Sequence, residues 1–231
     1  MKKTKNIALL VLLLITSLTN AQQMYIGSGF GKANFDGYEN SSGENTLDNS
    51  GYSKPQEISF ETGFLFKSYE ERVKYDIGLT YSKYKINTSF YSGNIRIPTT
   101  YNLSYFSLKA GASFTLIRWE RLKLNLLPYL TYDWLTYGTN AYRNVLLDIY
   151  KEKTLDRTLL SYHIGLGLEY RISGEFSTYV NYNVANSFIE ENKDSTVGEK
   201  YNLNRRAITI GLLFEIKGIS RNWSRLWNVR R

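Results

Sequence analysis

Histidine occurs once in this chain, at position 163, so any histidine-dependent chemistry must use that residue. His163 lies in an alternating run with Ser161 and Glu169, which are residue types of a nucleophile, base and acid arrangement. If the run is a strand, Ser161 and Glu169 are about 26 Å apart by strand rise. They cannot form a triad together, so catalytic partners of His163 would have to come from other strands. A hydrogen-bonded structural histidine is the simpler interpretation.

Metal, nucleotide and nucleic-acid chemistry find little support. The chain has no cysteine, and no acidic segment has calcium-loop spacing. Glu190, Glu191 and Asp194 are expected to form a solvated acidic patch. The run Gly27-Ser28-Gly29-Phe30-Gly31 has the composition of a nucleotide loop, but it lies inside a strand pattern without a following helix. The 29 basic and 21 acidic residues are dispersed, so no nucleic-acid partner is expected. We predict no catalytic residue, no cofactor and no metal.

The N-terminal residues have the layout of a secretory signal peptide. Lys2, Lys3 and Lys5 precede an apolar run from Ile7 to Ile15, which is too short to span a bilayer. A polar stretch ending in Ala21 follows, so cleavage is expected between Ala21 and Gln22. We therefore predict a signal peptide over residues 1–21 and a folded domain over residues 22–217.

The folded domain shows repeated alternation of apolar and polar residues, which is typical of strands with one apolar face. Twenty tyrosines and three prolines favour such strands over amphipathic helices. Eight strands are predicted, over Met24–Phe35, Ile58–Phe66, Val73–Ser82, Phe106–Leu116, Leu122–Trp134, Leu160–Ile172, Phe176–Val184 and Ile208–Ile216.

The connections between these strands alternate in length. The short ones are Ser68–Arg72, Arg118–Arg121 and Ser173–Gly174. The long ones are Asp36–Pro55, Asn87–Pro98, Thr136–Arg157 and Ser187–Asn204. An even-stranded outer-membrane barrel has short periplasmic turns and long extracellular loops, whereas a soluble sandwich has no reason to sort its loops in this way. The pattern predicts an all-β, eight-stranded, antiparallel up-and-down transmembrane barrel with both termini in the periplasm.

Burying polar groups in lipid is costly, and this cost determines which face of each strand contacts lipid and which faces the lumen. The apolar face contacts lipid, and the polar face lines a lumen that eight strands make just wide enough for side chains. Charges of both signs are expected to pair there, because an unpaired ion would cost several kcal/mol. The predicted lumen charge network consists of Glu61, Lys74, Asp76, Lys109, Lys123, Glu169, Arg171 and Glu215.

Aromatic residues near strand ends are predicted to lie at the membrane interfaces. They are Tyr75, Tyr81, Tyr132, Trp134 and Tyr170, together with Trp223 and Trp227 in the tail. Glycines on the lumen face, such as Gly63 and Gly78, are expected to make room for long side chains. Pro128 removes a ladder donor within a strand, so a local bulge or irregularity is expected there.

The opening Tyr25-Ile26-Gly27-Ser28-Gly29-Phe30 and the last strand, Thr209-x-Gly211-x-x-Phe214-x-Ile216, resemble the small eight-stranded outer-membrane barrels, the OmpA/OmpX-like group and in particular the PorT-like proteins. The resemblance covers about Met24 to Lys217. It implies outer-membrane lipid as surroundings and the barrel-assembly machinery as a partner during biogenesis. Family barrels often end on the aromatic residue of the last strand, whereas this chain continues to Arg231.

Residues 218–231 form a basic amphipathic tail, in which Ile219, Trp223, Leu226 and Trp227 share a helical face. Such a segment is either a short interfacial helix or a frayed extension. For function, we expect a non-enzymatic outer-membrane barrel with long extracellular loops that serve surface contact, envelope integrity or a secretion-related assembly. The alternatives are a lipid-modifying membrane enzyme using His163 and a narrow channel. The expected location is the bacterial outer membrane after Sec-type export.

Overall fold

The computed structural model describes residues 23–39, 47–48, 56–68, 72–92, 95–142, 145–152, 155, 157–188, 190–191 and 200–216. The predicted signal peptide, its cleavage site between Ala21 and Gln22, and the tail with Trp223 and Trp227 lie outside these residues. No helix in the described part of the chain is both long and apolar enough to cross a bilayer.

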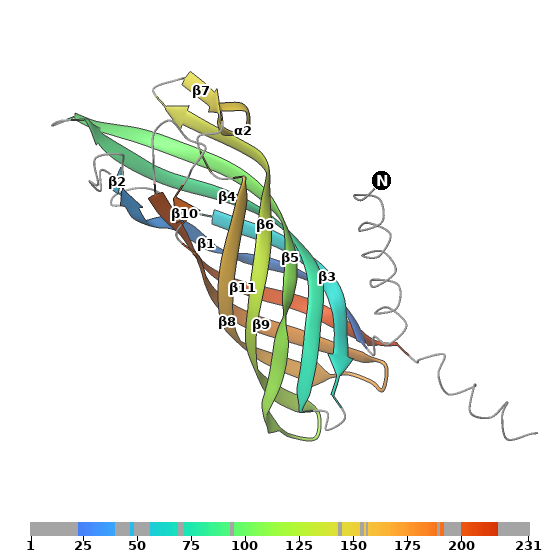
Figure 1. Ribbon diagram of the computed structural model, residues 1–231. Helices are drawn as coiled ribbons and strands as arrows, with labels where there is room; N and C mark the ends of the chain where they lie inside the picture. Colours follow the sequence, from blue (N-terminus) through green and yellow to red (C-terminus); the bar gives the residue numbers. More distant parts are fainter. Residues whose placement is uncertain are drawn as a thin grey trace, which may run out of the picture.

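Eight long antiparallel strands form a closed ring (Figure 1). They are β1 (Gln23–Glu39), β3 (Gln56–Lys67), β4 (Val73–Ser92), β5 (Ile95–Arg118), β6 (Leu122–Tyr142), β8 (Thr158–Arg171), β9 (Phe176–Ser187) and β11 (Lys200–Glu215). Each strand pairs with the next in the chain, and β1 pairs with β11 from Gln23↔Glu215 to Glu39↔Lys200, which closes the sheet. The predicted eight-stranded up-and-down barrel is confirmed.

Side chains of the ring alternate between an outer surface and the lumen. On β3, Phe60 faces outward and is 60% exposed, whereas its neighbour Ser59 is buried. On β8 the outward residues Ile164, Leu166 and Leu168 are all exposed. A broad belt of exposed apolar side chains requires an apolar solvent, and lipid supplies one.

Short links join the strands at one end of the ring, called the turn side here. Between β3 and β4 the Ser68 amide donates to the Val73 carbonyl at 2.8 Å. Between β8 and β9 the Ser173 hydroxyl accepts hydrogen bonds from the amides of Glu175 and Phe176, both at 3.2 Å. These compact turns agree with the three short connections that the sequence predicts.

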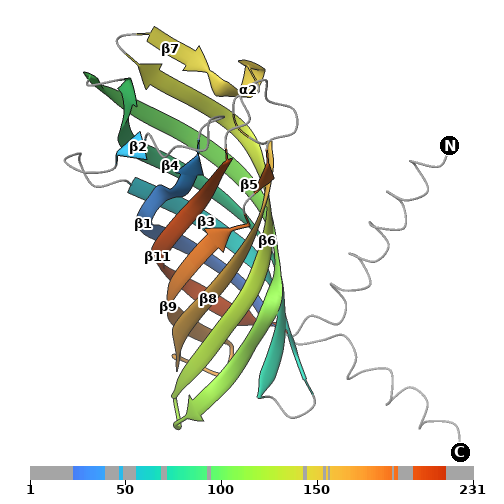
Figure 2. The same ribbon diagram turned by 60° about the vertical axis from the view of Figure 1, so that its left-hand side comes forward.

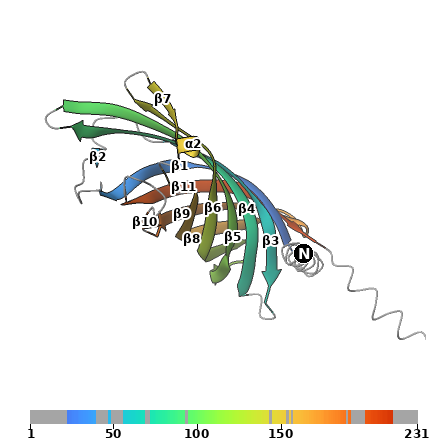
Figure 3. The same cartoon turned by 45° about the horizontal axis from the view of Figure 1, so that its top comes forward.

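At the opposite end, the loop side, two of the predicted long loops are largely strand, which corrects the sequence-based boundaries. β4 and β5 remain paired as far as Ser92↔Ile95, through most of the segment predicted to be a loop. β6 continues to Tyr142, and β7 (Val145–Asp148) and the helical turn α2 (Ile149–Glu152) follow. β7 pairs with β6, and β2 (Leu47–Asp48) pairs with β4, so a small sheet extends beyond the ring (Figures 2 and 3). The two-residue β10 (Glu190–Glu191) pairs with β11.

The hydrophobic alternation inverts where the strands enter this extension. On β4 the outward residues change from Tyr81 to Lys83 and Lys85, whereas the inward Tyr84 and Ile86 are buried apolar residues. Over Lys83–Ile86 the outward side chains of β4 are polar and the inward ones apolar, as in a water-soluble barrel. The lipid-facing pattern therefore stops before the strands do, and for that reason the predicted strands were too short.

Pro128 lies inside β6 and keeps its pairing on one side only. Its pairing with β8 continues from Leu127↔Gly165 through Pro128↔Ile164 without a shift. On the β5 side the same register relates the pairs Gly111↔Tyr129 and Phe114↔Leu126 that flank it. The register shifts between β5 and β6 lie elsewhere, at Ser104/Tyr105 and at Thr115/Ile117. No bulge forms at Pro128, because the register is the same on both sides of it. The expected irregularity is present instead as a gap in the β5–β6 pairing, which has no pair between Gly111↔Tyr129 and Phe114↔Leu126.

Candidate functional site in the barrel lumen

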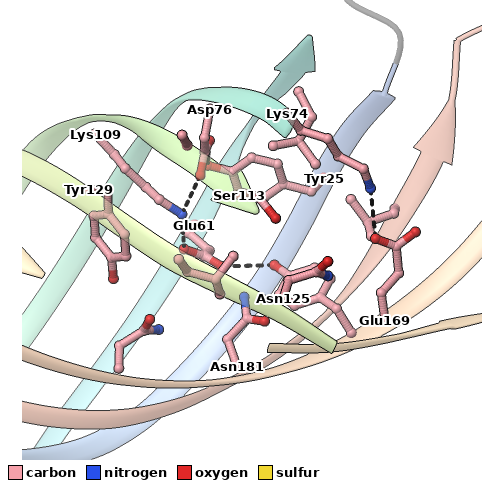
Figure 4. A pocket seen from close by; sticks show the side chains of 16 residues that line it. Tyr25, Glu61, Lys74, Asp76, Lys109, Ser113, Asn125, Tyr129, Glu169 and Asn181 are labelled. Carbon is pink, nitrogen blue, oxygen red and sulfur yellow. Dashed lines mark hydrogen bonds and ion pairs between the residues drawn. The ribbon is translucent and has the colours of Figure 1, made fainter. Parts of the chain in front are cut away.

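A cluster of charges fills the lumen toward the turn side, with Lys109 at its centre (Figure 4). Lys109 Nζ lies 2.9 Å from Asp76 Oδ2 and 3.4 Å from Glu61 Oε2, and all three side chains are buried or nearly so. The Tyr25 hydroxyl donates to Asp76 Oδ1 at 2.9 Å, and the Tyr179 hydroxyl donates to Glu61 Oε1 at 2.8 Å. The lone cation thus offsets two carboxylates, and each carboxylate gains a phenolic donor.

A second group of charges lies nearer the turns and is centred on Glu169. Lys74 Nζ lies 2.7 Å from Glu169 Oε2, and Lys123 Nζ lies 3.4 Å from Glu169 Oε1. At the rim, Lys67 pairs with Glu215 at 2.6 Å and is partly exposed. Seven of the eight predicted network residues therefore take part in ion pairs.

Arg171 is the predicted network residue that stays apart. It has the lumen-side parity of β8, but it is exposed at the turn-side end of that strand. Among the described residues, no carboxylate pairs with it. Position near a strand end, rather than parity, decides its surroundings.

Two tyrosines, rather than long charged side chains, occupy the space beside four of the lumen-facing glycines. The Tyr25 hydroxyl lies where a Cβ on Gly63 or Gly78 would be, and Tyr179 lies in the same way against Gly27 and Gly211. Tyr25 and Tyr179 meet edge to face, with ring centroids 6.3 Å apart. The long side chains expected at these glycines are therefore tyrosines and not members of the charge network.

His163 lies in the middle of the lumen beside Arg205. Arg205 Nη2 is 3.1 Å from His163 Nε2 and 3.2 Å from Asp133 Oδ2. Because a guanidinium can only donate, His163 Nε2 must act as the acceptor and carry no proton. The imidazole stacks on Tyr129 at 4.2 Å between centroids, and the Ser161 hydroxyl donates directly to Asp133 at 2.8 Å. In a catalytic triad the imidazole separates serine from the acid, whereas here Arg205 lies between His163 and Asp133.

Arg205, Asp133 and Glu57 are lumen charges that the predicted network did not contain. Arg205 also donates to the Tyr84 hydroxyl at 2.8 Å. Asp133 lies within the predicted strand Leu122–Trp134, but it was not included in the network. Arg205 falls outside the predicted last strand, which began at Ile208. Extending that strand by its inward parity would have placed Arg205 in the lumen.

The loop-side end of the lumen is closed by an apolar cluster, named the apolar cap here. Phe35 packs edge to face against Tyr101 and Tyr201, with centroids 5.1 and 5.4 Å apart. Ile149 of α2 and Leu155 reach into it from the β6–β8 connection. The cap consists of Ala33, Phe35, Tyr84, Ile86, Tyr101, Leu103, Tyr105, Leu135, Ile149, Leu155, Leu159, Tyr201 and Leu203.

The two lumen cavities that described residues line are small. The cavity around the Lys109 cluster measures about 50 Å³, and the one lined by Glu57, His163 and Arg205 about 40 Å³. Such volumes hold a few water molecules and no substrate of ordinary size. Among the described residues, no group of three or more His, Cys, Asp or Glu side chains is arranged to hold a metal ion.

The predicted interface aromatics of the ring all point outward. Tyr75, Tyr81, Tyr132, Trp134 and Tyr170 are exposed on the lipid-facing surface. Tyr132 and Trp134 also contact each other, with centroids 4.8 Å apart.

Comparison with known proteins identifies the family. A family model described as the outer membrane protein beta-barrel domain matches residues 7–215, and the chain belongs to this family. A search of curated proteins finds no match.

Solved structures of similar shape include three outer-membrane proteins. Neisserial surface protein A (NspA) is 12% identical over 84% of this chain and 97% of its own, with a TM-score of 0.48. The outer membrane protease OmpT from Escherichia coli is 9% identical over 84% and 97%, with a TM-score of 0.45. The outer membrane protein OprG from Pseudomonas aeruginosa is 13% identical over 85% and 97%, with a TM-score of 0.40.

Proposed function

We propose that this protein is a non-enzymatic outer-membrane barrel that presents its loop-side extension at the cell surface, for surface contact, envelope integrity or a secretion-related assembly. The observation that carries the proposal is the obstructed lumen. The apolar cap closes one end, ion pairs fill the other, and the two cavities that described residues line between them hold only a few waters. We therefore propose that the function depends on the outer surface of the protein and not on its lumen.

The arrangement around His163 supports the non-enzymatic proposal over a lipid-modifying enzyme. Its Nε2 already accepts from Arg205, and Ser161 is hydrogen-bonded to Asp133 rather than to the imidazole. A general base needs a free lone pair within reach of the proton that it removes. The bulk of the apolar cap likewise argues against a narrow channel.

Surface display can be tested with paired epitope tags. One tag is inserted directly after Tyr142, between β6 and β7 on the loop side, and the matched tag at Gly174 on the turn side. Antibody is expected to label intact cells only for the first, and both after permeabilisation. Labelling of intact cells through the Gly174 tag alone would reverse the orientation and refute display of the extension.

Planar-bilayer recordings of the purified barrel test the closed lumen. We expect no steady conductance from the wild-type protein. As a control for insertion, the same preparation should show different gel migration before and after boiling, which is the behaviour of a folded barrel. Stable single-channel steps from the folded protein would overturn the proposal in favour of a channel.

A further inference from the structure

Four cations mark the loop-side edge of the lipid-facing belt on neighbouring strands. Arg206 on β11, Lys32 on β1, and Lys83 and Lys85 on β4 all point outward and are exposed. On each of these three strands the first cation directly follows the last apolar outward residue, which is Ile208, Phe30 or Tyr81. β3 lies between β1 and β4 in the ring and carries Gln56 at the corresponding position. We name the four cations the basic arc.

The basic arc is not neutralised by the described part of the protein. No carboxylate among the described residues pairs with Lys32, Lys83, Lys85 or Arg206. Lys32 and Arg206 are direct cross-strand partners, and like charges in that position repel each other. An anion between the two side chains would remove this repulsion.

Two hollows on the outer surface coincide with the arc. One of about 470 Å³ lies beside Lys83 and Lys85, with Ile58, Tyr81 and Tyr137 in its wall. The other, of about 410 Å³, is lined by Lys32 and Arg206 together with Asn34, Phe35, Asp36 and Asn204. Both are several times larger than the lumen cavities and within the range that accommodates a ligand headgroup.

The first hollow lies beside an irregularity in the β5–β6 pairing. The register shifts between Ser104 and Tyr105, where Thr136 is the extra residue of β6. The Thr136 hydroxyl donates to the Ser104 carbonyl at 3.0 Å. Lys83 also lies over the Tyr81 ring, 5.9 Å from its centroid. Cations above an apolar wall suit a ligand with an anionic head and hydrocarbon chains.

The turn-side edge of the belt has a different charge pattern. There Arg72, Arg118, Arg121 and Arg171 are exposed alongside Glu120 and Glu175. Acidic and basic side chains are interspersed at that edge. Beside the basic arc, the acidic side chain among the described residues is Asp36, farther out on β1. The described loop-side edge therefore has fewer carboxylates among its cations than the turn-side edge has.

We infer that the basic arc binds the phosphate groups of the phosphorylated glycolipid that forms the outer leaflet of a bacterial outer membrane, with its acyl chains lying against the adjoining apolar wall. Electrostatic attraction of lysine and arginine to anionic headgroups is strongest at the headgroup level, which is where the arc lies. The inference rests on the proposed orientation, in which the loop side faces outward.

The experiment compares binding of two glycolipids to the purified, folded barrel in neutral detergent by native mass spectrometry. The probes are phosphorylated lipid A and its enzymatically dephosphorylated form with identical acyl chains, and phosphatidylglycerol serves as competitor. The wild-type protein should prefer the phosphorylated form. Lys32→Gln with Arg206→Gln, and Lys83→Gln with Lys85→Gln, should each lose on the order of 10- to 30-fold in that preference.

Two controls accompany the binding measurement. Lys151→Gln with Arg171→Gln removes two exposed cations outside the arc and should bind like the wild type. The charge-retaining Lys32→Arg with Arg206→Lys should also keep the preference, which tests the site even if a glutamine variant fails to fold. Equal binding of the two lipid A forms, full competition by phosphatidylglycerol, or unaltered binding by both glutamine variants would each overturn the inference. These outcomes do not depend on the epitope experiment, so the two proposals can fail separately.

Discussion

Lys74 Nζ lies 2.7 Å from Glu169 Oε2, and the two side chains are only 2% and 7% exposed. They belong to β4 and β8, on opposite arcs of the ring, so the pair joins strands that share no backbone hydrogen bonds. Lys123 adds a weaker contact to the same carboxylate. The lumen charges therefore connect the barrel across its interior and also fill it.

Replacing Lys74 with methionine should lower the free energy of unfolding by about 2–4 kcal/mol, because Glu169 would stay buried with only Lys123 nearby. Urea titration of the protein folded in phosphatidylcholine vesicles measures this change. Lys67→Met is the matched control, since the Lys67–Glu215 pair is 20% and 31% exposed. It should cost less than about 1 kcal/mol. Equal losses in the two variants would show that burial of the pair is unimportant.

Gly78→Ala should destabilise the barrel by about 1–3 kcal/mol, because its Cβ would overlap the Tyr25 hydroxyl and approach the Thr62 carbonyl. Gly174→Ala has nothing near its Cβ and should be close to neutral. The double variant Tyr25→Phe with Gly78→Ala should lose less free energy of unfolding than the two single variants together. The reason is that removing the Tyr25 hydroxyl also removes part of its clash with the new Cβ at position 78. Additive losses would contradict the contact between Tyr25 and Gly78.

His163→Gln should leave the lipid composition of the outer membrane unchanged while the barrel still folds. Glutamine can supply an acceptor for Arg205, but it cannot act as an imidazole base. Mass spectrometry of lipids extracted from cells carrying the variant or the wild type measures the outcome. A lipid species that disappears with His163 would establish the enzymatic alternative.

Ile86→Ala should cost about 2–5 kcal/mol, because Ile86 is completely buried in the apolar cap. The adjacent Lys85→Ala should change stability by less than about 0.5 kcal/mol in phosphatidylcholine vesicles, since that side chain points outward. The same urea titration compares them. A larger loss for Lys85→Ala would mean that the inversion of the two faces on β4 is wrong.

Sequence periodicity was sufficient to predict the ring and the direction of most side chains. Lipid requires one apolar face on every spanning strand, so the alternation places Lys74 and Glu169 in the lumen. It could not pair them, because spacing within a strand carries no information on which residues meet across the interior. The bond between Arg205 and His163 was missed for this reason and because the last strand was begun too late.

The apolar cap was not predicted, because its strands have apolar side chains on the inward face and not on the outward face that lipid requires. Tyr84 and Ile86 continue β4 with inward apolar side chains, where the lipid-facing rule expects polar ones. A prediction that follows the apolar outward residues therefore ends the strand where this segment begins. The tyrosines are ambiguous in a further way, since Tyr25 fills the lumen whereas Tyr75 faces lipid.

The inversion on β4 also fixes how deeply the protein is immersed. If the barrel moved deeper into the membrane by two residues, about 7 Å along the strand, Lys83 would enter the hydrocarbon. If it moved outward by the same distance, Tyr81 would be exposed to water. Arg206 on β11 and Val184 on β9 are cross-strand partners. Arg206 already lies beyond the apolar belt on the loop side, whereas Val184 still belongs to the belt. The edge of the belt therefore steps from strand to strand as the tilt of the strands requires. The amino-acid sequence thus encodes both the elevation of the barrel and its inclination in the bilayer.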